Sequence, residues 1–192
     1  MNILTLRYKS TNSYLLEADK NLLAIDAGWP GTYREYKNCL KEQGFKIENI
    51  HSLVVTHFHI DHAGLAGVFI QKGIELVVFE NQTGKIEEME VLIEKKQMEY
   101  TKIDLYKIRK MNINDSRSWL KSMGIDGEVL KTEAHSEDSI SVILDNGVAF
   151  IGDLPPESAM MEDDSKGRNS WQLLKEKGAR CIKPAHAAEF LL

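Results

Sequence analysis

The sequence predicts a layered α/β fold, in which helices pack on the faces of β-sheets. A mostly apolar strand candidate at 52–56 is followed by a helix candidate at 65–72 and by a second apolar strand candidate at 74–79. Strand, helix and strand in this order are typical of layered α/β folds. The length of 192 residues suits one domain, because single domains usually contain about 100–200 residues. We therefore expect residues 1–192 to form a single domain.

The first part of the chain predicts three strands followed by a helix. The strands are expected at 3–8, 13–18 and 22–26. Residues 19–21 (DKN) favour a hairpin turn between the second and third strands. After a break at 28–31 (GWPG), apolar and aromatic residues recur at helical spacing over 32–43, and Gly44 stops this helix.

The central elements are predicted to be buried. The strand at 52–56 (SLVVT) leaves no face for solvent, as in a sheet that is covered on both sides. The helix at 65–72 ends at Gly73, where the strand at 74–79 (IELVVF) begins.

Residues 81–122 differ from the rest of the chain, because Glu, Lys, Ile, Leu and Met recur there at helical spacing. We predict an insertion of amphipathic helices whose charged faces are solvated. The alternative is that this insertion is a lid over a substrate.

The last third of the chain returns to strands. We expect strands at 127–131, 139–144, 147–151 and 179–183, and a helix at 170–177 that Gly178 stops. Residues 145–147 (DNG) favour a tight hairpin turn between two of these strands.

The composition indicates a globular protein with an acidic balance. Hydrophobic residues make up 43% of the chain, charged residues make up 28%, and the formal net charge is −5, so a sizeable core is expected and disorder is not. No stretch is dense in Lys and Arg, which disfavours nucleic acid as a partner. Cys39 and Cys181 lie far apart, which excludes a CxxC motif, and we expect two reduced thiols.

Nothing in the sequence indicates export or membrane insertion. The first ten residues (MNILTLRYKS) lack the basic segment and apolar run of a signal peptide. No apolar stretch approaches the ~18 residues that span a bilayer. We therefore expect a soluble cytoplasmic protein with no membrane partner. The oligomeric state stays open, with a homodimer as the commonest arrangement.

The run His57–His62 (HFHIDH) places three imidazoles and one carboxylate within six residues, directly after a predicted strand. A loop at a strand end can turn alternate side chains toward one point. His57 and His59 could therefore hold one metal ion, while Asp61 and His62 hold a neighbouring ion. Imidazole nitrogen and carboxylate oxygen are ligands of zinc, whereas copper more often recruits Cys or Met and calcium requires an oxygen cage.

Further candidate ligands follow other predicted strands. They are His135, Asp153 and His186. Sites of layered α/β folds gather at such strand ends. Five of the six histidines occupy candidate ligand positions, and we interpret the sixth, His51, as a strand-edge or surface residue. The alternative is that each histidine is separately a core or surface residue, which is favoured for any one of them but not for the whole set.

The segment Thr56–Gly64 (THFHIDHAG) matches the THxHxDHxG signature of the metallo-β-lactamase superfamily at every position. Five other segments resemble motifs of this family: Asn12–Leu15, Ile25–Gly28, His135-Ser136, Gly152-Asp153 and His186. The resemblance covers nearly the whole chain and is weakest over 80–122. It implies an αββα sandwich with the metal ions at one edge.

The resemblance also implies a role for each ligand. The implied sets are His57, His59 and His135 for the first ion, Asp61, His62 and His186 for the second, and Asp153 as the bridge. Asp26 would orient a ligand histidine from behind. The implied cofactors are two divalent metal ions, with Zn²⁺ favoured and Mn²⁺ or Fe²⁺ as alternatives.

We expect a binuclear metal-dependent hydrolase in which the two ions share a water and lower its pKa, so that hydroxide attacks a carbonyl carbon or a phosphorus. Asp61 would be the catalytic residue that orients this nucleophile or passes on its proton. A small-molecule ester or thioester is the favoured substrate. A glyoxalase-II-like enzyme would carry a further helical domain after the last metal histidine, and a tRNA-processing relative would carry an RNA-clamping arm.

Other functions stay open. They are a phosphodiesterase, lactonase or β-lactam hydrolase of the same fold, a mononuclear iron oxygenase acting on persulfides, and a metal-binding sensor without turnover. His62 and His186 disfavour the mononuclear oxygenase, because they complete a second site. Candidate pocket residues are Trp29, Tyr100, Tyr106, Arg109, Trp119, Arg168 and Trp171, with core packing or solvated charge as the alternative for each.

Overall fold

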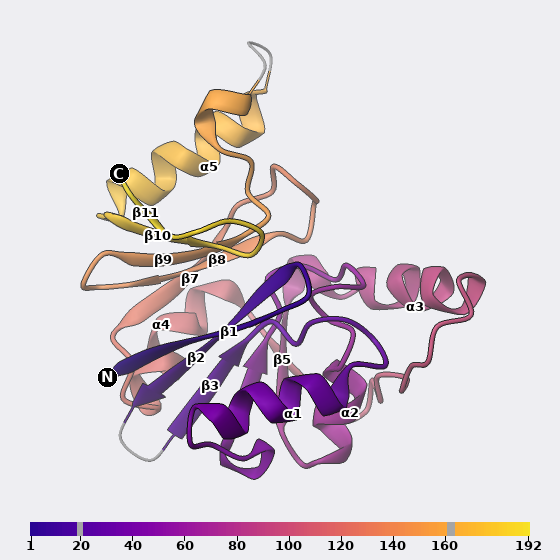
Figure 1. Cartoon of the computed structure of the whole chain (residues 1–192). Helices are drawn as coiled ribbons and strands as arrows, with labels where there is room; N and C mark the ends of the chain where they lie inside the picture. The colour runs from indigo at the N-terminus through magenta and orange to yellow at the C-terminus, as the bar shows by residue number, and fades with distance from the viewer. Residues whose placement is uncertain (19–20, 161–163) are drawn as a thin grey trace.

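The chain forms two β-sheets in the computed structural model, which describes residues 1–18, 21–160 and 164–192. The first sheet contains β1 (Asn2–Tyr8), β2 (Thr11–Ala18), β3 (Asn21–Ile25), β4 (Ser52–Val54), β5 (Glu75–Phe79) and β6 (Arg109–Met111), in this spatial order. The second sheet contains β7 (Gly127–Lys131), β8 (Ile140–Leu144), β9 (Val148–Gly152), β10 (Cys181–Pro184) and β11 (Phe190–Leu191), in the order β11-β10-β9-β8-β7. The two sheets are stacked one above the other in Figure 1.

The pairing of the strands determines where loops gather. Strands β1, β2 and β3 form an antiparallel meander, whereas β3, β4, β5 and β6 are parallel. In the second sheet, β9 and β10 are also parallel. Because parallel strands end at the same edge of a sheet, the loops after β3, β4 and β5 lie side by side.

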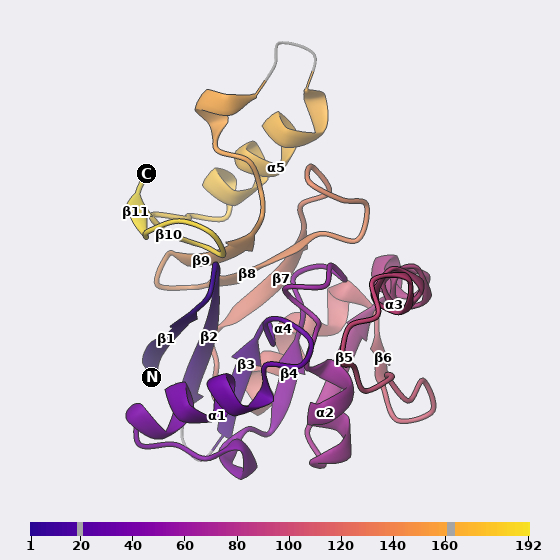
Figure 2. The same cartoon turned by 45° about the vertical axis from the view of Figure 1, so that its right-hand side comes forward.

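Helices cover the outer faces of both sheets (Figures 1 and 2). The helices are α1 (Tyr33–Glu42), α2 (Ala66–Gln71), α3 (Lys85–Lys95), α4 (Ser116–Ser122) and α5 (Ser165–Glu176), with short 3₁₀ turns at Ile47–Asn49, Glu80–Gln82, Ile113–Asp115 and Glu157–Ala159. Helices α1 and α2 lie under the first sheet, and α5 lies over the second. The αββα sandwich that the sequence predicted is confirmed.

Side chains of alternating strand residues build the layers, because successive residues of a strand point to opposite faces. On β3, Leu22 and Ala24 pack toward the helices, whereas Leu23 and Ile25 pack between the sheets. A third cluster lies between the second sheet and α5, where Trp171 is buried. Both sheets are therefore covered on both faces, which agrees with the apolar strands of the sequence.

Most predicted elements are confirmed within one or two residues. The turn at 145–147 is present, with Gly147 at φ 88° and its N–H bonded to the Leu144 carbonyl oxygen. Helix α5 begins at Ser165 instead of residue 170, because the Asp164 side chain accepts a hydrogen bond from the Gly167 N–H at 2.8 Å and caps the helix. Residues 19–20 of the predicted hairpin turn lie outside the described residues.

The segment 81–122 differs in part from the helical prediction. It contains helices α3 and α4, but it also contains the strand β6, which pairs with β5 in the first sheet. Trp119 and Leu120 of α4 are buried between the sheets. The second half of the segment is thus built into the sandwich. Helix α3 lies at the side of the molecule, near β5 and β6 (Figure 2).

No helix among the described residues combines the length and the apolar character that crossing a bilayer requires.

The loop after β4 packs closely against the loop after β3 at Gly64. A Cβ atom at this position would lie 2.2 Å from the Pro30 nitrogen and 2.4 Å from the Trp29 carbonyl carbon. The Gly64 N–H also donates to the Gly28 carbonyl oxygen at 2.8 Å. The absence of a side chain here lets the two loops touch.

We therefore expect Gly64→Ala to lower the free energy of unfolding by roughly 1–3 kcal/mol, because backbone atoms must move to make room. Urea denaturation followed by circular dichroism measures this change. Gly84→Ala is the control, since Gly84 has φ −84° and no atom near an added Cβ, and it should change stability by less than about 1 kcal/mol. Equal stability of the two variants would contradict the close packing of the loops.

Candidate metal centre

The seven predicted ligands come from four loops that meet at one edge of the sandwich. His57, His59, Asp61 and His62 follow β4, and the other three follow strands of the second sheet: His135 after β7, Asp153 after β9 and His186 after β10. Their ligand atoms form three groups, each within 4.8 Å: His57, His59 and His135; His57, His62 and Asp153; and Asp61, His62 and His186. The structure therefore brings all seven side chains together.

Three imidazole nitrogens converge in the first group. His57 Nε2 lies 3.0 Å from His59 Nδ1, and His135 Nε2 lies 3.1 Å from the same atom. Nitrogens bound at 2.0–2.1 Å to one tetrahedral zinc ion would be about 3.3 Å apart. The spacing of these nitrogens is therefore close to that of zinc ligands.

The second group combines a carboxylate with two imidazoles. Asp61 Oδ2 lies 3.2 Å from His186 Nε2 and 3.6 Å from His62 Nε2. This group shares His62 with the group that contains Asp153, so the two halves of the site are contiguous.

Asp153 lies between the two halves. Its Oδ2 is 3.8 Å from His57 Nε2 and 3.6 Å from His135 Nε2, on the side of the first group. Its Oδ1 is 3.3 Å from His62 Nε2 and 3.2 Å from His186 Nε2, on the other side. One carboxylate thus faces both halves, as a bridging ligand would.

Two of these atoms are buried and have no hydrogen-bond partner among the described residues: His62 Nε2 and Asp153 Oδ1. They are close enough for an ion pair at 3.3 Å, but their angles do not fit a hydrogen bond. Unpaired buried polar atoms cost free energy. A cation held between them would satisfy both, so the donor set fits divalent metal ions.

Hydrogen bonds behind the histidines orient their rings. The Nδ1 atoms of His57, His62 and His186 lie 3.2, 2.9 and 2.6 Å from Thr56 Oγ1, Asp26 Oδ2 and the Ser10 carbonyl oxygen. A carboxylate and a carbonyl can only accept, so Nδ1 of His62 and of His186 donates. The Nε2 lone pairs of these two rings consequently face the site, as metal ligands require.

Asp26 is the most constrained residue behind the site. It is buried, and its carboxylate accepts hydrogen bonds from the Thr56 N–H at 2.7 Å, the Thr56 hydroxyl and His62 Nδ1. Its backbone has φ 63°, a conformation that is uncommon for residues other than glycine. The structure thus places Asp26 behind a candidate ligand histidine, where the family resemblance put it.

Burial and the neighbouring carboxylates act in opposite directions on the pKa values of the histidines in the site. Burial, together with the neighbouring His62 and His59, holds the pKa of His57 well below its usual value, so His57 is neutral. Burial would also lower the pKa of His62, but the carboxylates of Asp26 and Asp153 raise it to about 10. The field at His62 therefore favours a positive charge on its Nε2 side.

Two residues that hold the loops of the site, Asp138 and Thr11, have no signal in the sequence that indicates this role. Asp138 is buried and accepts a hydrogen bond from the Phe58 N–H at 2.6 Å. Thr11, also buried, donates to Asp61 Oδ2 at 3.3 Å. Both are separated from their partners by fifty residues or more, so no local spacing in the sequence indicates these contacts.

A cavity of about 510 Å³ opens beside the candidate ligands. Its lining residues are Trp29, Phe58, His59, Ile60, Asp61, Lys85, Glu88, Met89, Leu92, Lys96, Ser136 and Asp138. Of the seven candidate pocket residues, Trp29 lines this cavity and the others do not. Trp119 and Trp171 are buried in the core, and Tyr106 is fully exposed. Trp119 and Trp171 are therefore core residues and Tyr106 is a surface residue, and none of the three lines this cavity.

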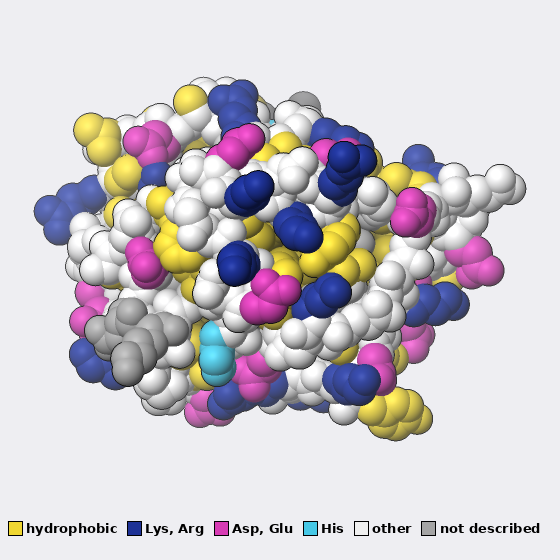
Figure 3. Space-filling view, turned by 60° about the horizontal axis from the view of Figure 1, so that its bottom comes forward, with side chains coloured by type: hydrophobic (Ala, Val, Ile, Leu, Met, Phe, Trp, Pro, Cys, Tyr) yellow, Lys and Arg dark blue, Asp and Glu magenta, His cyan; other side chains and the backbone are white. Residues whose placement is uncertain are grey.

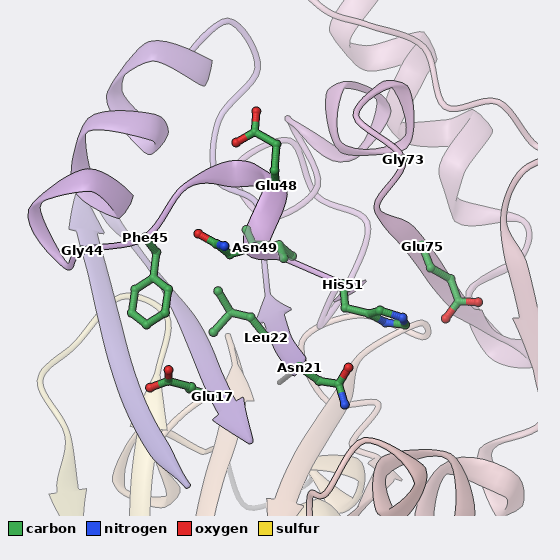
Figure 4. A pocket seen from close by; sticks show the side chains of 11 residues that line it. Glu17, Asn21, Leu22, Gly44, Phe45, Glu48, Asn49, His51, Gly73 and Glu75 are labelled. Carbon is green, nitrogen blue, oxygen red and sulfur yellow. The ribbon is translucent and has the colours of Figure 1, made fainter. Parts of the chain in front are cut away.

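A larger cavity, of about 740 Å³, lies at the other end of the first sheet. Figure 4 shows Glu17, Glu48, Glu75 and His51 among the side chains around it. Figure 3 shows the face of the molecule at that end, where positive and negative side chains are mixed. None of the seven candidate ligands lines this cavity, so size alone does not identify the site.

Comparisons with known proteins agree with this geometry. The family model described as the metallo-β-lactamase superfamily matches residues 6–177. A probable metallo-hydrolase of Methanocaldococcus jannaschii is 32% identical over 146 residues, which are 72% of this chain and 65% of that protein. The chain spans less than two thirds of the length of the curated relatives that it matches.

Solved structures show the same fold. A metallo-β-lactamase family protein of Thermus thermophilus superposes with a TM-score of 0.77 at 19% identity, over 98% of this chain and 74% of that one. A protein crystallised in a di-iron-bound form superposes with a TM-score of 0.73 at 17% identity, over 100% and 94% of the two chains.

We expect Asp26→Asn to weaken metal binding about tenfold to a hundredfold, because the variant loses the charge that orients and polarises His62. Competition with a chromophoric chelator measures the dissociation constant for Zn²⁺. Asp145→Asn, at the exposed turn between β8 and β9, is the matched control and should bind Zn²⁺ as the unchanged protein does. Equal affinity of both variants would refute this role of Asp26.

Proposed function

Because the chain belongs to the metallo-β-lactamase superfamily, we propose that it is a hydrolase that uses two divalent cations bound by the seven clustered side chains. The observation that carries this proposal is Asp153, whose two oxygens face the two halves of the site. His57, His59 and His135 would hold the first cation, Asp61, His62 and His186 the second, and Asp153 both. Zinc is the preferred metal, and iron and manganese are alternatives.

When bound, such cations would supply Lewis-acid chemistry and would lower the pKa of water toward about 7. The residues of this chain would orient the attacking water and accept its proton. Asp61 belongs to the second ligand group and also lines the cavity. Thr11 fixes its Oδ2, so the carboxylate is held where it can orient the attacking water and accept its proton.

A serine nucleophile is disfavoured by the contacts near the cavity. The Ser136 and Ser139 hydroxyls bond to each other at 2.8 Å, and the Ser139 hydroxyl also accepts from the Ser136 N–H. In the described part of the chain, neither hydroxyl is hydrogen-bonded to a histidine. These two serines therefore stabilise the loop that carries His135.

The cavity supports a small carboxylic ester or thioester as the substrate. Its volume of about 510 Å³ lies within the usual range of about 300–1,000 Å³ for small-molecule sites. A mononuclear iron oxygenase is disfavoured, because the second ligand group is complete. A phosphodiesterase, a lactonase and a metal-binding sensor are the alternatives that a substrate panel would distinguish.

The metal-loaded protein should contain about two equivalents of Zn, Mn or Fe by elemental analysis, and it should hydrolyse small esters or thioesters. His59→Ala removes the nitrogen shared by both short contacts of the first group. We expect this variant to lose about one equivalent of metal and roughly a hundredfold or more of its kcat/KM.

His51→Ala is the matched control, since His51 is exposed at the opposite end of the first sheet. It should keep full metal content and activity. Full activity of His59→Ala would refute the mechanism. Full metal content without turnover of esters, thioesters, lactones or phosphodiesters would instead favour the sensor.

A further inference from the structure

The cavity beside the candidate metal centre runs along one side of α3. Lys85, Glu88, Met89 and Leu92 of this helix, and Lys96 directly after it, line the cavity. Lys85, Met89, Leu92 and Lys96 follow one another at intervals of three or four residues, with Glu88 beside Met89, so they form one stripe along the helix. Lys85 Nζ lies 3.5 Å from Glu137 on the loop that carries His135. Lys96 is eleven residues further on, or about 16 Å at 1.5 Å per residue, at the other end of the stripe.

The cavity wall is apolar between these two ends. Phe58 and Met89 are buried, Trp29 and Ile60 are half-buried, and Leu92 is 42% exposed. Leu92 is one of the few large apolar side chains left open to solvent. An apolar group in the cavity would remove this surface from water, which stabilises a complex by about 25 cal/mol per Å².

The charged groups around the cavity are balanced except at Lys96. Lys85 pairs with Glu88 at 3.0 Å, and Asp138 is buried against the Phe58 N–H. Asp61 belongs to the metal centre. No carboxylate of the described residues lies within ion-pair distance of Lys96, although four other ion pairs form on this helix, its connecting loops and the adjacent sheet edge.

Helix α3 is held in place over the cavity. Ile86, Met89 and Ile93 pack into the core under the first sheet. The Glu90 side chain accepts hydrogen bonds from the Tyr100 hydroxyl at 3.2 Å and from the Ile103 N–H at 2.8 Å. The core contacts of Met89 within the stripe and of Ile86 and Ile93 beside it, together with the hydrogen bonds of Glu90, thus fix the stripe as a wall of the site.

We propose that the substrate is an ester or thioester of an apolar acyl chain that ends in a carboxylate. The scissile carbonyl lies at His59 and Asp61, the acyl chain lies along Leu92 and Met89, and the terminal carboxylate pairs with Lys96. This inference rests on the proposed hydrolase function and adds the class of the acyl group.

The reaction is a hydrolysis, so it needs no oxidant or reductant. The oxygen of water forms a bond to the acyl carbon, and the bond from that carbon to the alcohol oxygen or thiol sulfur breaks. The leaving group takes up a proton that the attacking water releases. The products are an alcohol or thiol and a dicarboxylic acid.

Matched para-nitrophenyl esters test this class on the zinc-loaded protein. The uncharged series is acetate, butyrate, hexanoate and octanoate, and the charged series is the monoesters of succinate, adipate and suberate. We expect kcat/KM to rise with chain length by up to about fourfold per methylene. We also expect at least one charged ester to exceed its uncharged counterpart of equal length by about fivefold.

Two pairs of variants distinguish the effect of losing a side chain in the cavity wall from a general effect of substitutions on α3. Lys96→Gln should abolish the preference for the charged esters, whereas Lys95→Gln, on the same turn but outside the cavity lining, should keep it. Leu92→Ala should reduce the gain with chain length, whereas Val91→Ala, which is also exposed and does not line the cavity, should not.

Binding of the product acids gives a second measurement that needs no turnover. Calorimetry compares suberate with octanoate on zinc-loaded protein, and Lys96→Gln should remove an advantage of suberate that Lys95→Gln keeps. Hydrolysis or binding without these preferences would overturn the acyl assignment and leave the hydrolase proposal standing. Absence of hydrolysis with Lys96-dependent binding of suberate would support the assignment and overturn the hydrolase proposal.

Discussion

Three hydrogen bonds to the buried carboxylate of Asp26 hold the rest of the site in place. They tie the end of β3 to Thr56 at the end of β4 and to the ring of His62. A buried carboxylate is stable only when its oxygens are satisfied. The loop after β4 must therefore stay in contact with the loop after β3, and Gly64 permits this contact because it has no side chain. The positions of the four candidate ligands in the first loop follow from this constraint.

Much of the fold and the clustering of the candidate ligands could be predicted from the sequence, because both depend on local patterns. The strand at 52–56 was recognisable from its apolar run, and the dense motif that follows it identified four candidate ligands. His135, Asp153 and His186 could be added because each follows a strand, and strand ends meet at one edge. The structure brings these seven side chains together.

Other features depend on contacts between distant parts of the chain, and no local sequence pattern indicates them. Asp138 accepts a hydrogen bond from the Phe58 N–H, which lies 80 residues earlier in the chain. Nothing in the sequence distinguishes this aspartate from the other acidic residues. The strand β6 is three residues long, and Arg109 and Lys110 give it no apolar signature. A substrate-covering role of 81–122 could be raised only as an alternative, because the amphipathic pattern of α3 shows which face is buried but not that its margin borders the candidate metal centre.

The hydrogen bond from His186 to Ser10 ends on a main-chain carbonyl oxygen. Every amino acid supplies that oxygen, so a substitution of residue 10 leaves the hydrogen-bond acceptor in place. A change in the length of the turn between β1 and β2 would instead displace it. Replacement of Ser10 by another residue should therefore preserve the orientation of His186, whereas an insertion or deletion in this hairpin turn should not, although the turn contributes no candidate ligand of its own.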